Sequence, residues 1–362
     1  MKKPYWFIPL LASLIARGRQ NRRTGFDSQR IERIWIHKPD HLGDAILARS
    51  ALCTIRNAWP NAKIFVACGP ETVPLLPLEN PSFKLEPFDN PFLGGCDSWL
   101  AYRRRVRRVK PDLLINLRHD LRDILLCWSI RAPYLATFDH RGLAVLATHP
   151  GPAPAEDRAE ADNNLELLRE ALGLKPCPAS PMTLPPGVLN TARALWDATP
   201  GSGPKILIHG AARTPAKLWP VAQWRSLLKM LRENWDARTA VIGQTCDAGF
   251  NREMVRQIQG IQDWTGRLDL IGAAAAIAAA DLLVGIDSGP GHLAAAVGTP
   301  VVSIMSGTNS TRRWSPDYQR ALVHSVPCAP CRLTQCSVSG HPCLREIAPE
   351  AVFKMTTQVR RR

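Results

Sequence analysis

Three features are missing from the sequence, and each absence disfavours a class of protein. Apart from a short apolar run at the start, no segment approaches the roughly 18 uninterrupted apolar residues that a transmembrane helix needs. No Asp-x-Asp pair occurs, so the usual carboxylate clamp for a catalytic divalent metal is missing. No zinc-finger, homeodomain or RNA-recognition motif occurs either, which argues against nucleic acid as a partner.

Acidic residues are scarce compared with basic ones. The chain has 46 Lys and Arg against 31 Asp and Glu, a formal net charge of +15. Part of this charge lies in residues 103–110, a block of arginines with one lysine and no interleaved aromatic residue. Such a block is attracted to anionic surfaces, so we expect an anionic glycan or a membrane leaflet as a partner. A solvated helix face is the alternative.

The first 17 residues combine lysines with a short apolar run that contains aromatic residues, and further arginines follow. The run is too short to span a bilayer and has no clear Ala-x-Ala cleavage site. We therefore expect residues 1–30 to form an interfacial anchor on the cytoplasmic face of a membrane. An extension that is disordered or packed on the core is the alternative.

Strand-like and helix-like segments alternate along a chain of 362 residues, long enough for two domains with their own cores. This alternation predicts an α/β fold. The proline-rich residues 149–155 are expected to be a linker, and residues 200–204 offer another candidate boundary. The expected strands are 31–37, 62–67, 112–116, 134–138, 205–209, 240–243, 282–286 and 300–304, and the expected helices include 44–58, 119–130, 162–172, 221–228 and 349–359.

The segment 286–296 joins the end of an apolar run to a glycine-spaced turn and then to a helix of small residues. A helix that starts at such a turn presents unpaired N–H groups and the positive end of its dipole, which predicts an anion site. The spacing also fits a dinucleotide-binding fingerprint. That motif, however, would follow the first strand of its unit and would need an acidic residue near the end of the next strand. Residues 300–313, which contain the next expected strand, include no acidic residue. A turn that serves only packing remains an alternative. The residues concerned are Asp287, Ser288, Gly289, Gly291 and His292.

Two further strand-to-helix turns carry charged residues. Asp44 falls in the first turn of an expected helix, where the dipole would keep its carboxylate ionised, as a general base requires; an ordinary helix cap is the alternative. After the strand 205–209, Arg213 and Lys217 are loop cations that are able to neutralise a pyrophosphate, with solvated cations as the alternative. Gln244 and Asp247 follow the strand 240–243, and by position alone we expect them to be nucleoside contacts.

Four of the ten cysteines fall within one short loop, whereas the other six are scattered. The Cys-x2-Cys-x4-Cys-x6-Cys order is able to wrap four thiolates around one ion, which predicts a structural zinc or iron site. Free thiols, an iron–sulfur cluster or two disulfides would use the same residues, and disulfides are disfavoured in the cytoplasm. The four residues are Cys328, Cys331, Cys336 and Cys343.

Three separated motifs resemble those of glycosyltransferase family 9, whose best-known members are the ADP-heptose:lipopolysaccharide heptosyltransferases. They are residues 40–44, residues 209–220 with Lys-x-Trp-Pro, and residues 287–292 with the downstream Gly-Thr-Pro and Arg-Trp-Ser-Pro. Their order and spacing agree with the family, and together they cover nearly the whole chain after residue 30.

The resemblance implies a GT-B architecture, in which two Rossmann-like domains face each other across a cleft. Residues 31–185 would form the acceptor-binding domain with its linker, and residues 186–345 the nucleotide-sugar-binding domain. Residues 346–362 would form a helix that packs back toward the first domain. The implied reaction is an inverting sugar transfer, in which cations and helix N-termini, without a catalytic metal, stabilise the leaving diphosphate.

The resemblance also assigns roles to individual residues. In that family the aspartate matching Asp44 is the general base, and the lysine matching Lys217 binds the donor diphosphate. Ala211 and Ala212 stand where heptosyltransferases often carry phosphate-binding hydroxyls, so Thr214 or backbone groups would supply those bonds. On the acceptor side we place Asp40, His41, Gly43 and Arg118; on the donor side Arg213, Thr214, Lys217, Gln244, Asp247, Asp287, Ser288, Gly289, Gly291 and His292.

We therefore expect a cytoplasmic enzyme, peripheral on the inner face of the inner membrane, that transfers heptose from ADP-heptose to a lipopolysaccharide-core or related glycan acceptor. Another nucleotide-sugar or a protein acceptor is an alternative. So is a non-catalytic GT-B-like protein that binds an anionic glycan or an assembly partner. The presence of Asp44, Lys217 and Asp287 together favours catalysis.

Overall fold

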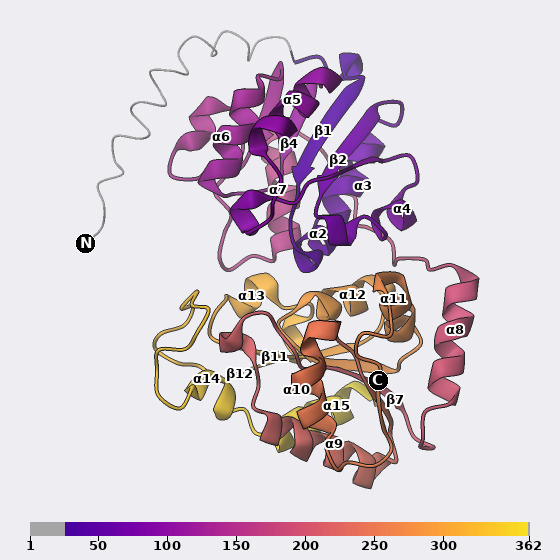
Figure 1. Cartoon of the computed structure of the whole chain (residues 1–362). Coiled ribbons are helices and arrows are strands. Elements are labelled where there is room, and N and C mark those ends of the chain that lie inside the picture. Colours follow the sequence, from indigo (N-terminus) through magenta and orange to yellow (C-terminus); the bar gives the residue numbers. More distant parts are fainter. Residues whose placement is uncertain (1–25, 361–362) are drawn as a thin grey trace. The chain divides into compact units, whose positions relative to one another are not determined.

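The structure is a computed structural model that describes residues 26–360 (Figure 1). The chain divides between Ser180 and Pro181 into two compact units, here called the first and the second unit. The expected interfacial anchor falls mainly on residues outside the described part. Within residues 26–360, no helix is both long enough and apolar enough to cross a membrane.

The first unit is built on a sheet of six parallel strands in the order β3-β2-β1-β4-β5-β6. The chain moves outward from β1 in one direction as far as β3 and then returns to β4 on the other side of β1. Open α/β sheets bind ligands beyond the carboxyl ends of the strands at such a switch point. The strands are β1 (Arg33–Lys38), β2 (Lys63–Cys68), β3 (Lys84–Pro87), β4 (Leu113–Asn116), β5 (Tyr134–Thr137) and β6 (His149–Pro150).

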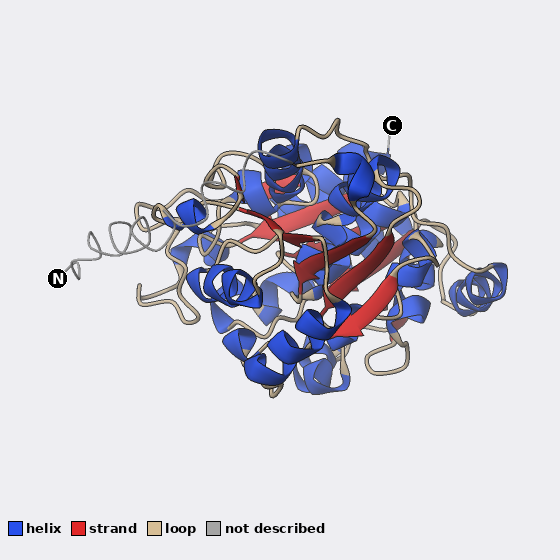
Figure 2. Cartoon of the chain, turned by 90° about the horizontal axis from the view of Figure 1, so that it is seen from above, coloured by secondary structure: helices blue, strands red, loops and turns tan. Residues whose placement is uncertain are grey.

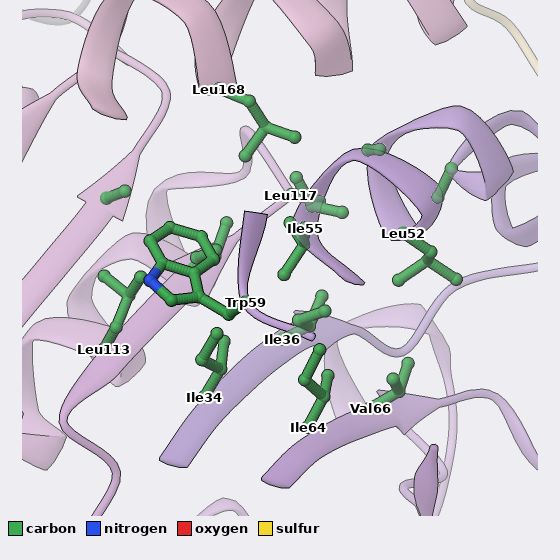
Figure 3. Close-up of a cluster of buried hydrophobic side chains, with 14 of the residues drawn as sticks. Ile34, Ile36, Leu52, Ile55, Trp59, Ile64, Val66, Leu113, Leu117 and Leu168 are labelled. Atoms are coloured by element: carbon green, nitrogen blue, oxygen red, sulfur yellow. The ribbon is translucent and has the colours of Figure 1, made fainter. Parts of the chain in front are cut away.

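Helices cover both faces of this sheet. Figure 2 shows the strands of the chain among helices. Successive residues of β1 point to opposite faces. Ile34 and Ile36 pack in the core beneath α3 and α7, which Figure 3 shows, whereas Trp35 packs beneath α5 and α6. Burial of each such aliphatic side chain stabilises the fold by about 1.5–3 kcal/mol. The α-helices are α2 (Leu42–Leu47), α3 (Arg49–Ala58), α4 (Leu76–Glu79), α5 (Trp99–Val109), α6 (Leu121–Ile130) and α7 (Glu160–Leu172).

The basic block lies on α5, and part of its charge has a structural use. Arg103 and Arg107 are one helical turn apart and donate to the carbonyls of Ser129 and Ile130, in the last turn of α6. Those carbonyls have no partner within their own helix, and cations near a helix C-terminus are favourable. The block is therefore more than a solvated helix face, because two of its arginines bind α6 to α5.

The second unit repeats the same topology with a second sheet of six parallel strands, in the order β12-β11-β10-β7-β8-β9. Its switch point lies between β7 and β10. The strands are β7 (Lys205–His209), β8 (Arg238–Val241), β9 (Ile261–Asp263), β10 (Leu282–Ile286), β11 (Val301–Met305) and β12 (Ala321–Val323). The α-helices are α8 (Pro186–Asp197), α9 (Val221–Trp235), α10 (Ala248–Val255), α11 (Leu270–Ala278), α12 (Gly289–Val297), α13 (Thr311–Trp314), α14 (Pro342–Arg345) and α15 (Pro349–Arg360).

Two details differ from the expectations. The helix expected over residues 44–58 is two helices that part at Ala48. Residues 149–155 do not separate the units, because β6 pairs with β5 and α7 then packs on α3, all within the first unit. The C-terminal helix α15 packs on α9, β10 and β11 of its own unit.

Candidate active site

A buried chain of hydrogen bonds runs through the first unit toward the carboxyl end of β1. The Trp35 indole donates to the hydroxyl of Tyr102 at 2.8 Å, and that hydroxyl lies 2.6 Å from Nδ1 of His37. Nε2 of His37 lies 2.9 Å from Oδ1 of Asp123, and Arg118 Nε donates to the other Asp123 oxygen at 2.7 Å. Buried polar groups with partners such as these fix side-chain positions.

We expect Tyr102→Phe to destabilise the protein, because it removes the hydroxyl that accepts the buried Trp35 N–H bond. A buried donor left without an acceptor costs about 1–3 kcal/mol, and the free energy of unfolding in urea should fall by that amount. The matched change Tyr318→Phe affects a tyrosine that is 58% exposed and should have no measurable effect. Equal stability of the two variants would show that the buried bonds contribute nothing.

Asp40 and Lys38 continue the network at the end of β1. Arg118 Nη1 lies 2.5 Å from Asp40 Oδ1, and Lys38 Nζ lies 3.2 Å from Asp40 Oδ2 and donates to the carbonyl of Leu117. Burial opposes ionisation of Asp40, but the charges of Lys38 and Arg118 outweigh it and hold the Asp40 pKa well below its usual range. Arg118 follows β4 and Asp40 follows β1, so their ion pair spans the switch point of the sheet.

Asp44 lies in the first turn of α2, half-buried. Within residues 26–360 no group hydrogen-bonds to its carboxylate. Burial, and next the negative charge of Asp40, raise the pKa of Asp44 to about 7, although Lys38 opposes the shift. The carboxylate was expected to stay fully ionised, and this is wrong: desolvation and a neighbouring acid leave it about half protonated at neutral pH.

Four residues of this network were not predicted from the sequence. His37 and Lys38 lie on β1 itself, Asp123 is in the first turn of α6, and Glu160 begins α7 and adds a negative charge that raises the pKa of Asp44. Glu160 is 116 positions from Asp44 in the sequence, and local pattern gave no sign of their proximity. Two of the expected acceptor-side residues, Asp40 and Arg118, form an ion pair. The other two lie apart from that pair: His41 Nδ1 is 3.7 Å from Glu71 Oε1, and Gly43 is part of the backbone of α2.

In the second unit, a lysine and an amide converge on Asp287 at the end of β10. Lys217 Nζ lies 2.7 Å from Asp287 Oδ2, and the Asn309 amide donates to the same oxygen at 2.9 Å. Lys217 ends the short helix η6 (Pro215–Lys217) after β7, and Asn309 follows β11. Three neighbouring strands therefore contribute one side chain each. Asn309 was not predicted, because one amide in a polar loop carries no signal.

Two histidines lie beside this ion pair. The Ser288 hydroxyl donates to the carbonyl of Ile286 at 3.1 Å and therefore accepts from Nδ1 of His209, 3.0 Å away. Nδ1 of His292, in the first turn of α12, is buried and has no hydrogen-bond partner within the described residues. Burial lowers the pKa of each histidine to about 4, so both rings are neutral at pH 7.

The other expected donor-side residues have different surroundings. Gln244 and Asp247 form a capping box on the helix η7 (Thr245–Asp247), in which the Asp247 carboxylate accepts the Gln244 N–H bond at 2.7 Å. Thr214 is the residue before η6, and Arg213 is exposed. Gly289 and Gly291 form the first turn of α12, and a side chain at Gly291 would crowd Pro316.

The cysteine loop packs against the Lys217 and Asn309 segments. Its backbone bonds to the carbonyls of Gly307 and Thr308 and to the N–H of Ala216. Within residues 26–360, however, no three His, Cys, Asp or Glu side chains are placed to hold a metal ion. The expected zinc or iron site is therefore not supported. Burial, and then the charges of the nearby Cys336, Cys328 and Cys331, raise the pKa of the Cys343 thiol.

Comparison with known proteins places this geometry in a family. The family model "Glycosyltransferase family 9 (heptosyltransferase)" matches residues 99–341. The chain is 28% identical to lipopolysaccharide heptosyltransferase 1 of Pseudomonas aeruginosa over 260 residues, which cover 66% of this chain and 67% of that protein. It is 27% identical to lipopolysaccharide heptosyltransferase 3 of Escherichia coli K12 over 301 residues, which cover 77% and 86%.

A solved structure supports the assignment of the fold. The structure of E. coli ADP-heptose lps heptosyltransferase II has a TM-score of 0.71 and 19% identity, and the match covers 90% of this chain and 98% of that one. The two parallel sheets with their flanking helices are thus the α/β fold of GT-B glycosyltransferases, as expected. Because the family model matches more than half of the sequence, this chain belongs to glycosyltransferase family 9, the heptosyltransferase family.

Proposed function

We propose that this protein transfers heptose from ADP-heptose to a hydroxyl group of a lipopolysaccharide-core or related glycan, with inversion at the anomeric carbon and Asp44 as the general base. The observation that carries the proposal is the Asp44 carboxylate, which no group within residues 26–360 hydrogen-bonds and whose pKa is about 7. A general base works best when its pKa lies near the working pH, and an ordinary helix cap would accept a backbone N–H bond.

The proposed reaction is a single displacement. The acceptor oxygen attacks the anomeric carbon as the bond to the diphosphate breaks, and Asp44 takes the hydroxyl proton. No covalent enzyme intermediate is required. The products are the glycosylated acceptor and ADP, whose diphosphate carries the negative charge that develops during the reaction.

Lys217 is the proposed partner of that diphosphate. It is held by Asp287 at 2.7 Å, and the first turn of α12 adds backbone N–H groups and the positive end of a nine-residue helix. The Nδ1 atom of His292 faces no partner within the described residues and is available to a donor oxygen. We propose that these groups stabilise the leaving diphosphate without a catalytic metal, as the missing Asp-x-Asp clamp suggests. Arg213, Thr214, Gln244 and Asp247 are proposed to complete the donor site.

The proposed acceptor site centres on Asp40, His41, Gly43 and Arg118. Arg118 is 7% exposed and its charge is matched by Asp40 and Asp123, so we assign it mainly to holding Asp40 beside Asp44. His41 has a half-exposed side chain, and we place it against the acceptor sugar. The proposed acceptor is anionic, in keeping with the net charge of +15.

The proposed location is the inner face of the inner membrane, with the protein bound peripherally. On α5, Trp99 and Leu100 are 45% and 44% exposed, on the same helix as the basic block. Exposed apolar side chains beside arginines suit a surface of anionic lipid.

Calorimetric titration of the full chain with ADP-heptose, ADP, UDP-sugars, GDP-sugars and NAD tests the donor assignment. We expect selective binding of ADP-heptose and ADP. Binding of another nucleotide-sugar would replace the donor while keeping the reaction class, and binding of none would leave a non-catalytic glycan-binding protein. Binding of NAD alone would contradict the proposal altogether.

A further inference from the structure

The last residues of the first unit are docked along one face of α3. The Cys177 N–H bonds to the hydroxyl of Thr54 at 2.9 Å, and the Ala179 N–H bonds to the hydroxyl of Ser50 at 3.1 Å. Arg49 donates to the carbonyl of Ser180 at 2.6 Å. Three successive contacts thus fix residues 177–180 on the helix that follows α2 and the Asp44 turn.

This docking brings together two cysteines that the sequence shows only as scattered. Sγ of Cys53, on α3, lies 2.8 Å from Sγ of Cys177, and both residues are half-buried. A disulfide has an S–S distance of about 2.05 Å, so the two sulfur atoms would have to approach by only about 0.75 Å to reach bonding distance. Within residues 26–360 no other pair of sulfur atoms is in contact.

The surroundings of the two thiols differ. The Asn57 amide donates to Sγ of Cys177 at 3.0 Å. Burial, and next the hydrogen bond with Cys177, raise the pKa of the Cys53 thiol to about 11, so Cys53 is a poor group for the first attack on a disulfide. Cys53 is, however, in contact with the Cys177 sulfur that it would have to attack in a second step.

We propose that Cys53 and Cys177 form a reversible disulfide, by exchange with a small-molecule disulfide such as oxidised glutathione, and that this bond fastens the end of the first unit to α3. The Cys177 thiolate attacks one sulfur of the small disulfide and releases one small thiolate. The Cys53 thiolate then attacks Cys177 in the mixed disulfide and releases the second. Two protein thiols are oxidised, one small disulfide is reduced, and the two protons pass to the released thiolates.

The bond would act on the connection between the units. Residues 177–180 are the last of the first unit. The second unit begins at Pro181, and there the Met182 N–H donates to the carbonyl of Ala296. In the reduced protein, residues 177–180 are held by hydrogen bonds that are free to open and close. In the oxidised protein, Cys177 cannot leave α3. The redox state would thereby set how much of the connecting chain is free to move.

The test is incubation of the full chain in glutathione buffers of increasing oxidised fraction, followed by alkylation of the remaining thiols and peptide mass spectrometry. We expect a peptide pair linked through Cys53 and Cys177 that forms with the oxidised fraction and is lost on reduction. Replacement of the loop cysteines by serine should leave this product unchanged, which separates it from oxidation of that loop. Those cysteines are Cys328, Cys331, Cys336 and Cys343.

A stability measurement on the same samples gives an independent result. The link closes a loop between positions 124 residues apart, so the oxidised protein should melt roughly 5–10 °C above the reduced one. Cys177→Ser should abolish this difference while melting as the reduced wild type does. Absence of the linked peptide in fully oxidised buffer, or equal yield from protein unfolded in urea, would overturn the proposal. Neither result depends on sugar transfer.

Discussion

Asp44→Asn is expected to reduce sugar transfer by about 10²- to 10⁴-fold while the protein folds normally and still binds ADP. The amide has nearly the same shape as the carboxyl group but is unable to accept the acceptor proton. Because the Asp44 carboxylate receives no hydrogen bond from the described residues, no network is broken by the change. Initial rates with ADP-heptose and a core glycan acceptor measure the effect.

The matched control is Asp27→Asn. Asp27 precedes the short helix η2 (Ser28–Arg30) and accepts the N–H bond of Gln29 as an ordinary cap. This variant should keep wild-type turnover. If Asp44→Asn did so as well, Asp44 would be a structural residue and the base would have to be sought elsewhere.

The pH dependence of transfer provides a second test of the same base. The pKa of Asp44 is about 7, so the fraction of ionised base rises as pH increases through that value. kcat/KM should therefore climb about tenfold per pH unit well below pH 7 and level off above it. In Asp44→Asn this limb should vanish from the residual activity.

The same carboxyl group is expected to cost stability at alkaline pH. Its pKa is raised from 3.8 in the unfolded chain to about 7, so its stabilising contribution is complete below pH 4 and is lost as pH rises through 7. Asparagine does not ionise. At pH 8, Asp44→Asn should therefore exceed the wild type in free energy of unfolding by on the order of a few kcal/mol, and the two should agree at pH 4.

The central strands of the fold were predictable from sequence, whereas the edges were not. The continuous apolar runs at β7 and β10 match the expected ranges, because strands buried on both faces leave an unmistakable pattern. β3, β6, β9 and β12 are two to four residues long and only partly buried, so they have no such run. The proline-rich residues 149–155 suggested a linker because proline excludes helix, yet proline is tolerated at a sheet edge such as β6.

The candidate site was predictable only where its residues lie in turns. Asp44, Lys217 and Asp287 each follow a strand in a recognisable motif, and the structure places Lys217 and Asp287 in contact. The surroundings that decide their chemistry come from distant segments. Burial of Asp44 and the negative charges of Asp40 and of Glu160, which lies on α7, raise the pKa of Asp44. The expectation of a fully ionised base is therefore wrong.

Lys217→Ala is the second change with a large expected effect. It removes the cation from the proposed diphosphate site, and it also leaves Asp287, which is 7% exposed, without its ionic partner. Loss of the cation from the proposed Lys217–diphosphate pair should cost roughly 2–4 kcal/mol of binding free energy, so affinity for ADP should fall by about 30- to 1,000-fold. Calorimetry with ADP measures this loss. Lys205→Ala, at the opposite end of β7, removes another paired lysine and should leave affinity unchanged.

A second substitution separates the two causes of that loss. In Lys217→Ala the Asp287 carboxylate keeps its bond to Asn309 but now repels the incoming diphosphate. Adding Asp287→Asn removes this negative charge and preserves a polar group of the same size. The double variant should therefore bind ADP more tightly than Lys217→Ala alone, though less tightly than the wild type. If the double variant bound ADP more weakly than Lys217→Ala, Asp287 would have to contact the donor directly. A carboxylate that only positions Lys217 makes no favourable contribution to ADP binding once the lysine is absent.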